Sequence, residues 1–247
     1  MPVPQVVDDA AVRWITVDRP EAANALTVDD LRHLTSAVQQ VDASTRAIVF
    51  TGAGDRVFCA GMHLDTFRGL DPVSARDVIT QVGDFLAAVR RSPVVTAVML
   101  NGACLGVALE LALACDLRVA RTGTMVGLPE VKLGIPSVVD AALLPAYVGL
   151  ARAREMILTG DSVSVEDLGS SFANRIVPAS QLRAETEQLI GAVTRHTPTV
   201  VAAQKSLFET WLNAGIEESV TTSIGVFGDV FADPTTGAAV ESYRSRT

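Results

Sequence analysis

The segment from Gly106 to Cys115 constrains the fold most, because its side chains are apolar on every side of a helix. Its sequence, GVALELALAC, holds a single polar side chain, that of Glu110. A surface helix carries a polar face, and this one has none, so we predict that it is buried all round. The segment is too short to cross a membrane, which takes about 20 apolar residues. The sequence therefore predicts a soluble globular protein.

Glu110 is the first candidate for a functional side chain. A buried, unpaired carboxylate costs several kcal/mol or takes up a proton. One interpretation is a structural ion-pair partner. The favoured one is a carboxyl group with a raised pKa that faces a pocket, because general acids and bases are made in this way. A second candidate acid is Glu130, directly after a predicted short strand, where a glutamate is ordinarily solvated.

Two glycine-containing turns could supply free backbone N–H groups. Ala60-Gly61-Met62 lies in a stretch, residues 58–65, that we predict to be irregular. Gly106-Val107 opens the apolar helix, whose first N–H groups have no acceptor within the helix. If both turns face one cavity, the two N–H groups form an oxyanion hole. The alternative is a pair of ordinary tight turns.

The periodicity of apolar residues predicts an α/β fold with parallel strands. Helices are expected at 28–41, where Thr27 and Asp30 could cap the first turn, and at 73–89 and 106–115. Asp8-Asp9 is expected to be a turn, and the chain beyond Ser137 to be mostly helical. Strands are predicted at 12–17, 47–50, 94–100, 117–120, 124–127 and 175–177. This alternation is typical of parallel sheets with crossover helices.

Composition excludes several classes of function. The net charge of −8 leaves no basic patch for nucleic acid. The three histidines lack metal-ligand spacing, and there is no GxSxG motif of a serine hydrolase. Gly52-Ala53-Gly54 is a poor match to a dinucleotide-binding turn. Cys59, Cys104 and Cys115 are expected to be core residues of a protein in a reducing compartment, and no secretory signal is visible, so we expect a cytoplasmic location.

Five motifs resemble those of one superfamily, and they span nearly the whole chain. The chain is similar to the crotonase superfamily and, within it, to the enoyl-CoA hydratase/isomerase proteins. The motifs are RPEAANAL (19–26), FCAGMHL (58–64), NGACLGVALELALACD (101–116), PEVKLGIP (129–136) and ANRIVP (173–178). The resemblance implies a spiral of ββα units over residues 1–195. It also implies a helical C-terminal part, residues 196–247, that forms homotrimers or hexamers.

The resemblance further implies an acyl-CoA thioester as substrate. Its carbonyl oxygen would accept hydrogen bonds from the N–H groups of Met62 and Val107. Glu110 and Glu130 match the two glutamates that add water across a 2-enoyl thioester. No metal is needed, and coenzyme A is part of the substrate, so no separate cofactor is expected. The alternatives are double-bond isomerisation, other acyl-CoA enolate chemistry, and an acyl-CoA-binding subunit without activity.

The resemblance also suggests which residues contact the substrate. For coenzyme A they are Arg19, Ala22, Ala23, Ala60, Leu64, Gly106 and Lys205. The chain departs from the family's pattern at His63, where aspartate is usual, and at Gly106-Val107-Ala108, where three glycines are common. A glycine-rich segment after Gly134 is replaced by PSVVDAAL. We therefore expect His63 and Asp140 near the acyl pocket.

Overall fold

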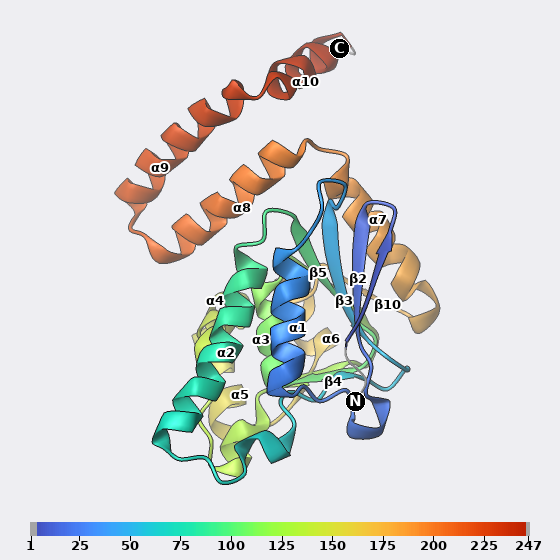
Figure 1. The fold of residues 1–247 in the computed structure, drawn as a ribbon, viewed down its shortest axis with the longest axis vertical. Coiled ribbons are helices and arrows are strands. Elements are labelled where there is room, and N and C mark those ends of the chain that lie inside the picture. Colours follow the sequence, from blue (N-terminus) through green and yellow to red (C-terminus); the bar gives the residue numbers. More distant parts are fainter. Residues whose placement is uncertain (1–3, 246–247) are drawn as a thin grey trace.

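The computed structural model describes residues 4–245, and two sheets organise its core (Figure 1). The six-stranded sheet has the order β1-β2-β3-β5-β7-β10, with only the β1–β2 pair antiparallel. The strands are β1 (Gln5–Asp9), β2 (Val12–Val17), β3 (Ala47–Gly52), β5 (Val95–Leu100), β7 (Leu117–Arg121) and β10 (Arg175–Val177). The four-stranded sheet consists of β4 (Val57–Cys59), β6 (Ala103–Leu105), β8 (Met125–Gly127) and β9 (Val163–Ser164).

The chain repeats one path through these sheets. β3 and β4 lead to helix α2 (Pro72–Arg90), and β5 and β6 lead to helix α3 (Val107–Ala114). β7 and β8 are followed by short helical elements, among them α4 (Leu144–Val148) and α5 (Leu150–Thr159). Each pass adds one strand to each sheet before a helical segment. This repetition confirms the predicted spiral of ββα units.

Helix α3 lies at the centre of the core, as its sequence predicts. All eight of its residues are buried. It contacts α2 on one side and a 3₁₀ turn (Val139–Leu143) on another. The three cysteines are buried too, as expected of core residues. Because no side of α3 meets bulk water, a polar side chain on it faces either a partner or a cavity.

The local capping prediction for helix α1 (Val28–Gln39) is confirmed. The Thr27 hydroxyl accepts from the Asp30 N–H, and the Asp30 carboxylate accepts from the Thr27 N–H at 2.7 Å. The helix ends before Val41. Two other local predictions are wrong. Asp8 and Asp9 end strand β1 rather than form a turn, and residues 57–59 form β4, a strand too short to show alternation.

The C-terminal part is helical. Helices α6 (Val165–Leu168) and α7 (Leu182–Thr194) lie against the spiral. The last three, α8 (Pro198–Asn213), α9 (Ile216–Asp229) and α10 (Pro234–Arg244), extend beyond it (Figure 1). Across residues 4–245, no helix combines the length and the hydropathy that a bilayer span requires.

Candidate active site

A cavity of about 100 Å³ lies at the N-terminus of α3. Met62, Val107, Glu110 and Glu130 all line it, so the four residues predicted to carry the chemistry share one space. The rest of its wall is mostly apolar, with side chains from α2 and from the segment after Glu130. In such surroundings, charges and hydrogen bonds act more strongly than in water.

The two glycine turns touch each other. Gly61 has φ of +97° and Gly106 has φ of +58°, in the region that favours glycine. A Cβ on Gly61 would lie 3.5 Å from Val107 N, and one on Gly106 would lie 3.6 Å from Gly61 Cα. Any side chain at either glycine would therefore enter the space between the two turns.

The N–H groups of Met62 and Val107 have no acceptor among residues 4–245, unlike those of His63 and Gly106. The His63 N–H donates to Leu26 O at 2.7 Å, and the Gly106 N–H donates to Gly127 O at 3.0 Å. Val107 is the first residue of α3, where the helix offers its N–H no partner. The two free donors belong to turns in direct contact, which is the arrangement that an oxyanion hole requires.

Glu110 is 4% exposed, and its pKa is raised to about 9, chiefly by burial. The nearby carboxyls of Glu130 and Asp140 contribute to this rise, whereas a hydrogen bond from the Ala141 N–H opposes it. Among the described residues, no cation offsets the cost of charging Glu110. The carboxyl therefore holds its proton at neutral pH, and the interpretation as an ion-pair partner is wrong.

Glu130 faces the same space from a 3₁₀ helix (Pro129–Leu133). Its Oε1 would lie 3.2 Å from a Cβ on Gly106, which places the carboxyl beside the glycine turns. Burial raises the pKa of Glu130, and hydrogen bonds from its own N–H and from Ser137 lower it. The Ser137 hydroxyl donates to Glu130 Oε2 at 3.2 Å. Sequence reasoning missed Ser137, although a lone hydroxyl in the apolar run IPSVV was the available signal.

Five of the predicted coenzyme A contacts lie close together on three neighbouring segments. Ala60, Leu64 and Gly106 line the cavity. Ala22 and Ala23 do not, but the Ala60 N–H donates to Ala23 O at 3.0 Å, so their segment runs beside the cavity wall. The side chain of Leu64 is largely exposed at this position.

The two basic residues among the predicted contacts are placed differently. The Arg19 guanidinium is buried, pairs with Asp30 at 2.6 Å and donates to Ala25 O at 2.5 Å. The Lys205 ammonium is buried against Asp116. Neither residue lines the cavity, and both cations neutralise acids inside the chain, which argues against the two predicted coenzyme A contacts. Arg118, the basic residue nearest to Asp116 in the sequence, donates to backbone carbonyls instead.

The two residues expected at the acyl pocket also lie outside its lining. The His63 side chain is about one-third exposed, and its Nδ1 accepts from the Asp65 N–H at 3.3 Å. Asp140 is buried behind the cavity and pairs with Arg90 of α2. Among the residues that the structure describes, no cluster of three His, Cys, Asp or Glu side chains could hold a metal ion.

Solved structures share this fold along the whole chain. An enoyl-CoA hydratase from Mycobacterium smegmatis superposes with a TM-score of 0.94 at 26% identity, covering 100% of this chain and 97% of that one. The protein is thus a member of the crotonase superfamily. A family model for enoyl-CoA hydratase/isomerase matches residues 8–246, and the chain belongs to that family.

Two relatives that are named as hydratases match most of the chain. A crotonyl-CoA hydratase of Syntrophomonas wolfei is 30% identical over 222 residues, which is 87% of this chain and 85% of that protein. A short-chain-enoyl-CoA hydratase of Clostridium acetobutylicum is 26% identical over 230 residues, 91% of this chain and 87% of that protein.

Proposed function

We propose that the protein adds water across the double bond of 2-enoyl-CoA thioesters. One observation carries the proposal: two carboxyl groups and two free backbone N–H groups line a single cavity. Hydration needs a proton acceptor for water, a proton donor for carbon, and stabilisation of the enolate that forms between the two steps. The cavity offers all three.

The thioester oxygen fits between the two glycine turns. There it accepts hydrogen bonds from the Met62 and Val107 N–H groups, which have no acceptor among the described residues. When water adds to C3, negative charge develops on this oxygen. Removing one such donor typically costs about 2.7–4 kcal/mol of the barrier. Because the donors are main-chain groups held by packed turns, they need no reorganisation as the charge appears.

The two glutamates handle the protons. Glu110, the more deeply buried of the two, holds a proton at neutral pH, and Glu130 serves as the carboxylate in the proposed mechanism. A water molecule between the carboxyls adds its oxygen to C3 and gives one proton to the carboxylate. The carboxylic acid delivers a proton to C2, so the pair again holds one proton at the end. Two close carboxyls suit this exchange because each disfavours ionisation of the other.

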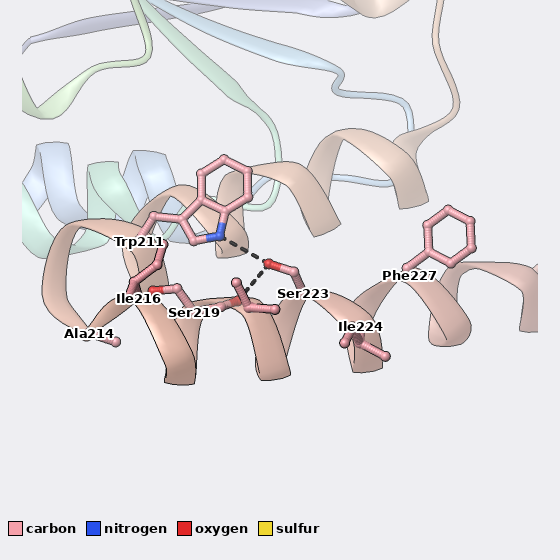
Figure 2. A pocket seen from close by; sticks show the side chains of 8 residues that line it. Trp211, Ala214, Ile216, Ser219, Ser223, Ile224 and Phe227 are labelled. Carbon is pink, nitrogen blue, oxygen red and sulfur yellow. Dashed lines mark hydrogen bonds between the residues drawn. The ribbon is translucent and has the colours of Figure 1, made fainter.

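We also propose that the chain assembles as a homotrimer or hexamer through its last three helices. α8 and α9 flank an apolar groove lined by Trp211, Ile216, Ile224 and Phe227 (Figure 2). Inside the groove, Trp211 Nε1 donates to Ser223 Oγ at 3.0 Å. Ile224 and Phe227 are 70% and 68% exposed in a single chain. An apolar area of this kind marks an interaction site.

Hydration of crotonyl-CoA, followed by the loss of its conjugated absorbance, tests the proposed activity. Glu110→Gln and Glu130→Gln should each lower kcat by about 10²–10⁴-fold with a modest change in KM, because acid–base groups act in the transition state. Glu155→Gln, on the exposed face of α5, is the control and should keep the wild-type rate.

Three results would contradict the hydratase proposal. Wild-type rates in both glutamine variants would exclude the acid–base roles. Conversion of a 3-enoyl-CoA to the conjugated isomer, without hydration, would identify an isomerase. Binding of acyl-CoA without turnover of a panel of thioesters would identify a binding subunit.

A further inference from the structure

We propose that Asp140 is a positioning residue for the glutamate pair: paired with Arg90, it anchors the segment Ser137–Ala141, which holds Glu130 at one end and Glu110 at the other. The inference deepens the proposed function and rests on it. Asp140 does not line the cavity and has no contact with the reacting atoms. Its effect on the reaction would pass through the two carboxyls.

Both ends of the segment make a hydrogen bond to a glutamate. The Ser137 hydroxyl donates to Glu130 Oε2 at 3.2 Å. Four residues later, the Ala141 N–H interacts with the Glu110 carboxyl while also donating to Val138 O at 3.0 Å. Glu110 and Glu130 come from different elements of the chain. This short segment contacts both, so its position sets the distance and orientation between them.

The anchor lies between the two ends. Asp140 pairs with Arg90, in the last turn of α2, and only 11% and 20% of the two side chains are exposed. Arg90 also contacts Glu209 of α8 at 3.4 Å, which leaves it fixed from a second side. A buried ion pair resists separation, because removing one partner leaves the other charge buried and unpaired. The pair therefore fixes the segment against α2.

The backbone next to the anchor is strained. Val139 has φ of +41°, a conformation that a β-branched residue rarely adopts. Such a residue persists only where the surrounding structure holds it. Packing against α2 contributes, since Val139 Cγ1 lies 3.5 Å from the position of a Cβ on Gly83. The Arg90–Asp140 pair, on the adjacent residue, is the other restraint, so we expect the segment to relax when the pair is lost.

The pKa of Glu110 provides a readout that a purely structural role of Asp140 would not change. The groups that act on Glu110 are Glu130 and Asp140, which raise its pKa, and the Ala141 N–H, which lowers it. Asp140 is in turn faced by Arg90 of α2 and Glu209 of α8. Asp140→Asn removes a negative charge near Glu110 and leaves the Arg90 cation less neutralised. Both changes lower the pKa of Glu110.

The test combines kinetics with a titration. Asp140→Asn should lower kcat for crotonyl-CoA by about 10–100-fold, with KM changed by less than about 3-fold, because misplaced catalytic groups lose rate rather than affinity. In the unliganded protein, ¹³C NMR of the glutamate carboxyls should show the pKa of Glu110 shifted downward. Its signal is assigned by its loss in Glu110→Gln. Glu187→Gln, which removes one charge from the exposed Arg183–Glu187 pair of α7, should leave both readouts unchanged.

A folded Asp140→Asn protein with wild-type kcat and an unchanged Glu110 titration would overturn the proposal. If this variant fails to fold, a comparison of the activities of Arg90→Lys and Arg90→Met tests the proposal instead. The lysine, which keeps a cation beside Asp140, should retain far more activity than the methionine, and equal rates would overturn the proposal. If wild-type protein hydrates no enoyl-CoA, the proposed function fails, but the titration in unliganded protein still decides whether Asp140 acts on Glu110.

Discussion

Replacing Glu110 by glutamine should stabilise the protein while it inactivates the enzyme. The structural reason is the raised pKa of about 9, against an ordinary value of 4.5. The unfolded chain releases this proton above pH 4.5, whereas the native protein retains it until about pH 9. Native stability therefore falls as the pH rises through this window. Glutamine is nearly isosteric with the protonated acid and has no proton to lose.

The size of the effect follows from the pKa difference. Each pH unit between the two pKa values costs 1.36 kcal/mol, so retaining the proton costs the native protein about 3 kcal/mol at pH 7. At pH 5 the unfolded chain is itself largely protonated, and the cost is less than about 1 kcal/mol. Glu110→Gln should thus gain about 3 kcal/mol over wild type at pH 7 and less than about 1 kcal/mol at pH 5.

Urea unfolding from pH 5 to pH 8.5, at one fixed protein concentration, measures this difference. The concentration is fixed because self-association shifts apparent stability. Glu155→Gln, an exposed glutamate, should show no such dependence on pH. A stability gap between Glu110→Gln and wild type that stays constant with pH, or a less stable variant at pH 7, would refute the assigned burial and protonation of Glu110.

Three further outcomes are expected. Gly106→Ala should lower kcat by at least about 10²-fold, because its methyl would lie 3.2 Å from Glu130 Oε1. The control Gly123→Ala, at a glycine with φ of +80° in open space, should keep wild-type kinetics. Lys205→Met should destabilise the fold by about 3 kcal/mol in urea, because Asp116 is left without its cation, and it should not raise the KM for a CoA thioester. Ile224→Glu, in the α8–α9 groove, should lower the mass of the assembly in analytical ultracentrifugation, and an unchanged mass would argue against that surface as the interface.

Local and periodic features of the fold could be predicted because their causes lie within a few residues. The apolar run of α3 allows no exposed face, and the Thr27–Asp30 capping box marks the start of α1. The second sheet was harder to predict. Its strands are two or three residues long, so each depends on pairing with partners distant in sequence rather than on its own pattern.

The site predictions differed in outcome according to whether they depended on contacts between side chains distant in sequence. Glu110, Glu130 and the two glycine turns lie in segments whose sequence already marks them, and the structure brings them to one cavity. The partners of the charged residues could not be identified in this way. Asp116 pairs with Lys205, 89 positions away, although Arg118 is the basic residue nearest to Asp116 in the sequence.

The sequence by itself determined that a carboxyl would be buried on an apolar helix and that two glycine turns could leave backbone donors free. Those properties follow from hydrophobicity and backbone geometry within single segments. Only the tertiary structure decided that the donors face the two acids, and that Arg90 and Asp140 fix the segment behind them. Such pairings depend on how separate elements pack, because an ion pair or a shared cavity is a property of positions in space.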